Sequence, residues 1–201
     1  MKNIKNYINL YKTNKNYKRN LFPLFRTIKN LINFEFESIL DYGCGQSNMS
    51  ELFNSHFKCK TYKYDPGIEE YSIIKKNIKY DLILNCDVME HIPVDEVDIV
   101  LKEISQLSSN VFFNIYLTEA KTILPDGTNA HCTVMPISWW KNKLEHFFKN
   151  VVIVPSSYKN SVSFITWKID RKTKFAAYFL LLIDVLEYLI WLFRIKILRR
   201  S

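Results

Sequence analysis

The chain has 201 residues, the length of one globular domain with terminal extensions, and its 48% hydrophobic residues are ample for a buried core. The formal net charge of +8 is concentrated at the ends: residues 1–34 carry eight Lys or Arg and no acid, and residues 171–201 carry seven basic and two acidic residues, whereas residues 35–170 carry 13 basic and 18 acidic ones. An acidic centre argues against the uniformly basic face of a nucleic-acid-binding protein, and two basic ends fit either a membrane surface or a composition that is simply rich in lysine.

The four cysteines lie at positions 44, 59, 86 and 132 and form no Cys-x-x-Cys pair. No signal peptide is recognisable before them. We therefore expect reduced, buried thiols in a cytoplasmic protein that can sit peripherally on the inner face of a membrane.

Two helices are predicted within a basic N-terminal extension over residues 1–34. In the first, Ile4, Ile8 and Tyr11 form a narrow apolar stripe at helical spacing. The second begins near Pro23, a residue that suits the first turn of a helix. Its apolar face consists of Phe25, Ile28, Leu31 and Ile32.

The central domain, predicted over residues 35–170, opens with a strand, a glycine loop and a helix. Asp41 follows the apolar end of the strand, Gly43 and Gly45 make the turn, and Ser47 begins a helical pattern. A unit of this kind brings backbone N–H groups and a helix N-terminus to a ligand, with no Cβ atom to block its approach. We therefore expect a nucleotide-like ligand at this loop.

Three more strands and an amphipathic helix follow. The strands cover residues 60–65, 80–86 and 111–117. The first of them ends in Asp65, 22 positions beyond Gly43, where a carboxylate binds both ribose hydroxyls in a nucleotide-binding half-sheet. The helix is predicted over residues 93–108, with Pro93 at its start and acids in its first turn.

Taken together, these motifs resemble those of the class I S-adenosylmethionine-dependent methyltransferases. The resemblance covers residues 37–168 and is carried by the strings Leu-Asp-Tyr-Gly-Cys-Gly, Tyr-Asp-Pro and Asp-Val-Met-Glu-His-Ile-Pro. It implies a Rossmann-like α/β sheet with helical extensions at both ends, and S-adenosylmethionine as the cofactor. The resemblance places the cofactor at Asp41, Gly43, Cys44, Gly45, Asp65 and Asp87.

One departure from this pattern concerns the segment after the second strand. The resemblance implies a helix, a strand and another helix there, whereas only 14 residues separate Asp65 from Tyr80. We therefore expect a shortened segment that lacks one strand, and the adenine contacts of the family cannot be transferred to this chain.

A dinucleotide-binding fold, and with it a nicotinamide-dependent oxidoreductase, is the competing interpretation of the glycine loop. It shares the strand, the first two glycines and the distant acid. It requires a third glycine where this chain has Asn48, and it has no use for Asp41. The methyltransferase interpretation is therefore favoured.

A long loop, from Thr118 to His131, follows the fourth strand. In open α/β sheets such loops at the carboxyl ends of strands hold ligand sites, and the sequence Pro125-Asp-Gly within it predicts a turn. A helix is predicted next, over residues 136–148, and of its two tryptophans only one can face the core. Two strands, 150–155 and 161–169, are expected to pair antiparallel at the sheet edge.

The candidate catalytic residues are His131, Glu90 and His91. His131 is the best candidate for a general base, since it lies on the long loop and imidazole titrates near neutral pH. Asp87-x-x-Glu90-His91 resembles the Mg²⁺-binding element of ubiquinone-pathway O-methyltransferases and of plant small-RNA terminal 2′-O-methyltransferases, the latter with a downstream histidine for which His131 is a candidate. Glu-His-Ile-Pro also recurs in family members without a metal, and we expect no metal ion here.

The C-terminal residues 171–201 are predicted to form a hydrophobic helix with basic flanks. Nineteen residues from Phe175 to Phe193 are apolar except Asp184 and Glu187. Such a helix is about 28 Å long, but one carboxylate at the bilayer centre costs about 2.5–3.5 kcal/mol. We therefore favour a helix that lies in the membrane interface, in contact through residues 175–198, over a packed or dimeric helix and over a spanning one.

The sequence thus predicts an S-adenosylmethionine-dependent methyltransferase that acts on an oxygen of a small molecule, a glycan or a lipid-linked precursor. One alternative is an RNA ribose methyltransferase, which the basic N-terminus and the Glu-His element suggest, although nucleic acid is not the partner we expect. Another is a non-catalytic membrane adaptor with a methyltransferase fold.

Overall fold

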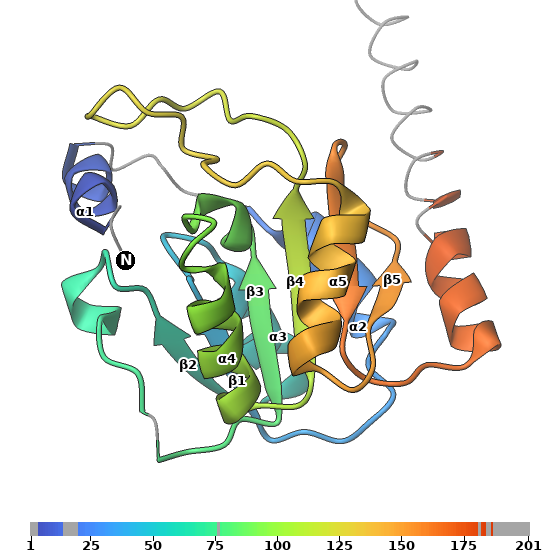
Figure 1. The fold of residues 1–201 in the computed structure, drawn as a ribbon. Helices are drawn as coiled ribbons and strands as arrows, with labels where there is room; N and C mark the ends of the chain where they lie inside the picture. Colours follow the sequence, from blue (N-terminus) through green and yellow to red (C-terminus); the bar gives the residue numbers. More distant parts are fainter. Residues whose placement is uncertain (1–3, 14–19, 76, 181, 184–185, 187–201) are drawn as a thin grey trace, which may run out of the picture.

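The computed structural model describes residues 4–13, 20–75, 77–180, 182–183 and 186 of the chain. Within them lies one sheet of six strands in the order β2-β1-β3-β4-β6-β5 (Figure 1). The strands are β1 (Ser38–Tyr42), β2 (Lys60–Tyr64), β3 (Leu82–Cys86), β4 (Val111–Tyr116), β5 (Val152–Val154) and β6 (Ser161–Ile165). The first four are parallel, whereas β6 runs antiparallel to both β4 and β5. This mixed sheet confirms the predicted class I methyltransferase fold.

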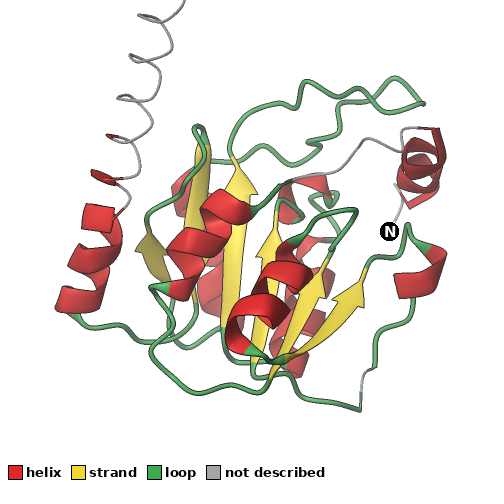
Figure 2. Ribbon diagram, turned by 180° about the vertical axis from the view of Figure 1, so that it is seen from behind, coloured by secondary structure: helices red, strands yellow, loops and turns green. Residues whose placement is uncertain are grey.

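Helices cover both faces of the sheet, α4 and α5 on one and α2 and α3 on the other (Figures 1 and 2). The helices are α1 (Ile4–Thr13), α2 (Phe22–Lys29), α3 (Met49–Phe57), α4 (Val97–Leu107) and α5 (Ile137–Phe147), with 3-10 turns η1 (Glu69–Tyr71) and η2 (Met89–His91). The sheet is thus the middle layer of three, a consequence of parallel strands whose two faces both have to be buried.

The alternation of side chains along the strands divides the core into two parts. Phe113 of β4 belongs to the cluster beneath α4 and α5, whereas its neighbour Phe112 belongs to the cluster beneath α2 and α3. All five residues of the central strand β3 are buried, as expected for a strand covered on both faces. Leu24 and Ile28 of α2 are completely buried in the second cluster, so this part of the N-terminal extension is built into the core.

The segment between β2 and β3 is as short as the sequence predicts. Of residues 65–81, all described except residue 76, three form the 3-10 turn η1 and none forms a strand. The sheet therefore ends at β2, and the edge beyond that strand has no further β-strand among the described residues.

Two predicted elements differ from the observed ones by four residues at one end, the first because of a local turn and the second beside a tertiary contact. The helix expected from Pro93 begins only at Val97, because a turn precedes it in which Glu96 N–H donates to the Pro93 carbonyl at 2.8 Å. The strand expected to reach residue 169 ends at Ile165, and beyond it the Trp167 indole Nε1–H donates to the Leu31 carbonyl at 3.0 Å.

The C-terminal tail is described only in part. Residues 171–180 are helical, with Ala177 buried against the core and Phe175 and Phe179 exposed. Asp184 and Glu187, on which the membrane argument depended, lie outside the described residues. In the part of the chain that the structure describes, no helix combines the length and the hydropathy needed to cross a bilayer. Among the cysteines, Cys132 is exposed, so the expectation that all four are buried is wrong.

We predict different contributions to stability from the adjacent tryptophans of α5. Trp140 is completely buried, whereas Trp139 is half-buried with the Lys143 Nζ 5.4 Å from its ring centroid. Trp140→Ala should lower the free energy of unfolding by about 3–5 kcal/mol because it opens a cavity in the core, and Trp139→Ala by about 1 kcal/mol. Urea denaturation of both variants measures the difference, and equal losses would contradict this placement.

Candidate active site

The loop after β1 is shaped by two glycines with positive φ. Gly43 has φ 77° and Gly45 has φ 48°, in the left-handed region that favours glycine. A Cβ atom on Gly43 would lie 2.5 Å from Cγ2 of Val88, so a side chain there would collide with the segment after β3. The N–H groups of Gly43 and Cys44 donate to the Tyr64 carbonyl at 2.7 and 3.1 Å, which ties the loop to the end of β2.

Asp65, the acid that follows β2, lies directly beside this loop. Its Oδ2 accepts a hydrogen bond from Gly45 N–H at 2.9 Å, and its Oδ1 accepts one from Gly67 N–H at 2.8 Å. The Tyr11 hydroxyl donates to Oδ2 at 3.3 Å. Burial raises the pKa of this carboxyl group, while the three hydrogen bonds favour its ionised form.

Asp41 lies on β1 and contacts the start of α3. Its Oδ2 accepts a hydrogen bond from the Ser50 hydroxyl at 3.1 Å, and only 2% of the residue is exposed. Burial raises its pKa to about 7, against the opposing effects of the Ser50 hydrogen bond and the Lys63 charge. At neutral pH this carboxyl group is therefore poised between its neutral and ionised forms.

Cys44 and Asp87 complete the predicted cofactor set. Cys44 is buried in the glycine loop, and burial raises the pKa of its thiol far above neutral, so it is a small apolar lining residue and no nucleophile. Asp87 follows β3 with φ 59°, an uncommon conformation for a residue with a Cβ atom, and its N–H donates to the Asn114 carbonyl at 2.9 Å. Strained backbone of this kind gathers at functional sites.

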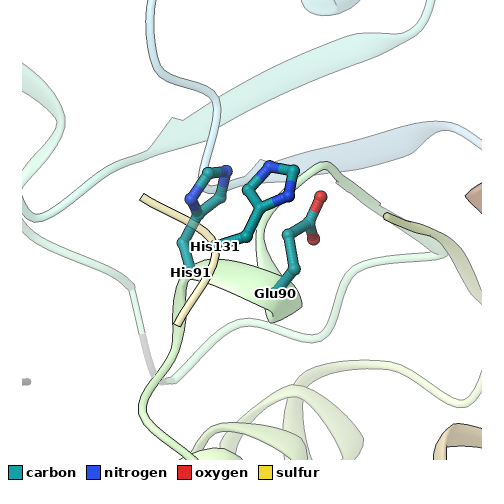
Figure 3. A group of neighbouring side chains, drawn as sticks. All are labelled: Glu90, His91 and His131. Carbon is teal, nitrogen blue, oxygen red and sulfur yellow. The ribbon is translucent and has the colours of Figure 1, made fainter. Parts of the chain in front are cut away.

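The three candidate catalytic residues meet in space. Glu90 and His91 lie on η2, and His131 lies at the end of the loop between β4 and α5 (Figure 3). One oxygen or nitrogen atom from each of the three lies within 4.8 Å of the others. The two imidazole rings meet edge to face, with ring centroids 4.8 Å apart and an interplanar angle of 73°, and the Glu90 carboxylate lies beside His131 (Figure 3).

Backbone groups hold each member of this cluster in place. Glu90 is completely buried, and its Oε1 accepts a hydrogen bond from Tyr116 N–H at 3.2 Å. The His91 Nδ1 lies 2.8 Å from the Ala130 carbonyl, and the His131 Nδ1 lies 2.6 Å from the Thr118 carbonyl. A carbonyl oxygen can only accept, so in the tautomer that makes these two hydrogen bonds Nδ1 carries the proton and the lone pair of the neutral ring is on Nε2.

Helix α1 bridges the cofactor loop and this cluster through two tyrosines that sequence reasoning did not single out as site residues. The Tyr11 hydroxyl contacts Asp65, and the Tyr7 hydroxyl lies 2.7 Å from Nδ1 of His91. The helix docks on the long loop through Leu10, which packs with Leu124 and Ala130 (Figure 1). The spacing of four between the tyrosines places them on one helix face, but the sequence does not say which face docks.

Aromatic side chains continue from the cluster along the carboxyl edge of the sheet. The Tyr116 ring lies 5.4 Å from the His131 ring, and the Tyr158 ring stacks on Tyr116 at 6.3 Å with an interplanar angle of 18°. These rings come from the end of β4 and from the turn before β6. They form a wall beside the cluster at which a planar or ring-shaped molecule can pack.

The sequence matches the model of a family described as a methyltransferase domain, over residues 14–149. The chain belongs to this family. Together with the mixed sheet, this gives it the fold of the class I methyltransferases. A comparison with curated proteins found no match.

Several solved structures share the fold. A candidate O-methyltransferase from Nostoc punctiforme aligns with a TM-score of 0.54 and 13% identity over 73% of this chain and 55% of that one. The 1,6-didemethyltoxoflavin N1-methyltransferase of Burkholderia thailandensis, with bound 1,6-didemethyltoxoflavin and S-adenosylhomocysteine, aligns with a TM-score of 0.54 and 10% identity over 82% and 87%. The mitomycin 7-O-methyltransferase MmcR aligns with a TM-score of 0.50 and 11% identity over 71% of this chain and 52% of that one. The chain thus spans about half the length of the first and last of these proteins.

We predict that Asp41 makes the cofactor-free protein less stable as the pH rises. With a pKa of about 7 in the folded state and about 3.9 when unfolded, Asp41 holds a proton in the native protein that the unfolded chain has released. The free energy of unfolding should therefore fall by about 1–3 kcal/mol between pH 5 and pH 7. Asp41→Asn, which can still accept from Ser50, should not show this fall. Urea titrations at both pH values test the difference, and parallel curves would contradict it.

Proposed function

We propose that this methyltransferase transfers the methyl group to a hydroxyl oxygen of a small molecule, a glycan or a lipid-linked precursor. The observation that carries the proposal is the convergence of Glu90, His91 and His131 at the carboxyl edge of the sheet. An amine acceptor needs no such group, because it loses its proton in solution. A hydroxyl acceptor must lose its proton as it reacts, and a cluster of basic side chains promotes that loss.

The cofactor half of the site fits S-adenosylmethionine by its shape and by its donors and acceptors. A side chain at Gly43 would collide with Val88, and one at Gly67 would crowd Tyr11 and Asp65, so glycine at both positions keeps the loop close to Asp65. Asp65 presents a buried carboxylate for ribose hydroxyls beside the Gly45 N–H. Asp41 lies on β1, directly before the loop, and its ionised form would favour binding of the positively charged methionine end of the cofactor. Asp87, directly after β3, is the remaining residue of the proposed cofactor site.

The cofactor supplies an electrophilic methyl group on a cationic sulfur. In the transfer the acceptor oxygen forms a bond to the methyl carbon as the carbon–sulfur bond breaks, sulfur keeps the electron pair, and the hydroxyl proton leaves towards the cluster. The protein's part is to align the oxygen, the carbon and the sulfur, which is worth up to about 7–11 kcal/mol in the best cases. The Tyr116 and Tyr158 rings are placed to position the acceptor.

Two comparisons support a small acceptor. The mitomycin and didemethyltoxoflavin enzymes that share the fold are named for ring-containing small molecules, one methylated on oxygen and one on nitrogen. Because the didemethyltoxoflavin enzyme is named for methylation of nitrogen, methyl transfer to nitrogen is one of the outcomes to be tested. Exposed Phe175 and Phe179 on the C-terminal helical segment support a lipid-linked acceptor within the same proposal.

We predict that Asp65→Ala abolishes cofactor binding. The variant removes the acceptor of three hydrogen bonds, and with it the ribose partner. Calorimetric titration with S-adenosylmethionine should give micromolar affinity for the unaltered protein and at least about a 100-fold loss for the variant. Asp98→Ala, which removes an exposed carboxylate on α4, is the matched control and should bind normally. Tighter binding of NADH than of S-adenosylmethionine would contradict the assignment.

We also predict that His131→Ala slows transfer to an oxygen acceptor. Acceptors are first found by incubating the protein with labelled S-adenosylmethionine and fractions of small phenols, sugars and lipid extracts. With the acceptor in hand, kcat should fall about 10²–10⁴-fold in His131→Ala while cofactor affinity is kept. His146→Ala, in which an exposed histidine of α5 is removed, should be unaffected. An unchanged kcat in His131→Ala, or an acceptor nitrogen, would refute oxygen transfer assisted by this residue.

A further inference from the structure

We propose that helix α1 blocks the cofactor site of its own chain and that S-adenosylmethionine has to displace the helix in order to bind. Tyr11 of this helix holds the carboxylate of Asp65, on which the ribose hydroxyls would bind, and Tyr7 of the same helix contacts His91. The inference rests on the cofactor placement proposed above and adds a regulatory step to it. Cofactor binding and release of His91 become one event.

The first argument is the number of acceptor positions on Asp65. An ionised carboxylate offers about four lone-pair directions, two on each oxygen. Oδ2 accepts from Gly45 N–H at 2.9 Å and from the Tyr11 hydroxyl at 3.3 Å, and Oδ1 accepts from Gly67 N–H at 2.8 Å. One direction is left, whereas the two hydroxyl groups of a ribose need two. The two N–H groups belong to the backbone of the loops, so the Tyr11 hydroxyl, which makes the longest of the three hydrogen bonds, is the donor that the ribose replaces.

The second argument is the space in front of the two glycines. A Cβ atom on Gly67 would lie 3.0 Å from Cε2 of Tyr11, and one on Gly45 would lie 3.3 Å from the Tyr11 hydroxyl oxygen. Atoms in ordinary contact are about 3.5–4.0 Å apart, so the tyrosine side chain already covers both glycines where they adjoin Asp65. A ribose that binds Asp65 and lies against these glycines would overlap the tyrosine.

The third argument is that α1 is held by a small interface. Leu10 is the buried residue of this helix and packs with Leu124 and Ala130, whereas α2 buries four residues. An exposed hydrogen bond from the Asn6 amide to Asp126, at 2.6 Å, adds a contact with the long loop. Elements with few buried apolar contacts open at low cost in free energy. The helix can therefore leave the site while the core beneath the sheet stays intact.

The two tyrosines of α1 connect the cofactor loop to the catalytic cluster. They lie one helical turn apart on the same face, with ring centroids 6.2 Å apart. The Tyr7 hydroxyl lies 2.7 Å from Nδ1 of His91 and donates to the Ala130 carbonyl at 3.2 Å. A short helix moves as a unit, so displacement of Tyr11 by the cofactor also removes Tyr7 from His91. The cluster is thereby released for the acceptor when the methyl donor is bound.

The test is the direction in which a Tyr11 substitution changes cofactor affinity. The full chain is titrated by calorimetry with S-adenosylmethionine and, separately, with S-adenosylhomocysteine. Tyr11→Phe removes a hydrogen bond to a carboxylate that competes with the ribose, so the affinity should rise at least about 10-fold, and Tyr11→Ala, which also clears the space, should raise it further. Tyr178→Phe, at an exposed tyrosine of the C-terminal helical segment, is the matched control and should leave the affinity unchanged.

Hydrogen exchange provides a second measurement that needs no variant. Saturating S-adenosylmethionine should make the backbone amides of α1 exchange faster while those of the glycine loop exchange more slowly. Lower or unchanged affinity in Tyr11→Phe, or slower exchange of α1 with cofactor bound, would overturn the proposal, because Tyr11 would then be a cofactor ligand or a bystander.

The same titrations separate a failure of the block from a failure of the cofactor site. Loss of binding in Asp65→Ala together with weaker binding by Tyr11→Phe would keep the cofactor site and refute the block alone. Absence of binding by both the unaltered protein and Tyr11→Phe at millimolar cofactor would overturn both.

Discussion

The carboxylate of Asp65 joins three segments of the chain that are remote in sequence. It accepts hydrogen bonds from the glycine loop after β1, from Gly67 after β2 and from Tyr11 of α1. A buried carboxyl group without such partners would be costly to ionise, so each of the three segments is held where it can donate. The position of the cofactor loop relative to the second strand, and of the first helix relative to both, follows from this one buried acceptor.

The segment after β3 connects the cofactor loop to the cluster of Glu90, His91 and His131. Val88 fills the space next to Gly43, and two residues further on Glu90 is buried beneath Tyr116 N–H. A shift of the glycine loop would therefore press on the segment that carries Glu90 and His91. Helix α1 contacts both halves of the site: Tyr7 contacts His91 of the cluster, and Tyr11 contacts Asp65 at the cofactor loop. The methyl donor and the groups that act on the acceptor are thus coupled by direct packing.

Much of this could be predicted from the sequence because the signals are local. Gly43 and Gly45 were predicted to make a turn and do so with positive φ. The shortened segment before β3 was visible from its length alone. The boundary at Val97 was missed because a local turn between Pro93 and Glu96 precedes the helix. The boundary at Ile165 was missed because the chain beyond it is held by the hydrogen bond between Trp167 and Leu31, which are distant in sequence.

By itself, the sequence determined the order of strands and helices, the glycine loop and the identity of the candidate residues, since these depend on apolar periodicity and on backbone conformations open only to certain residues. Tertiary structure alone decided which candidates meet. His131 comes within reach of Glu90 and His91 only because the long loop folds back over the carboxyl edge of the sheet. Likewise, the pKa of Asp41 rises through burial among neighbours, and the docking of Tyr7 and Tyr11 depends on surfaces that exist only once the sheet has formed.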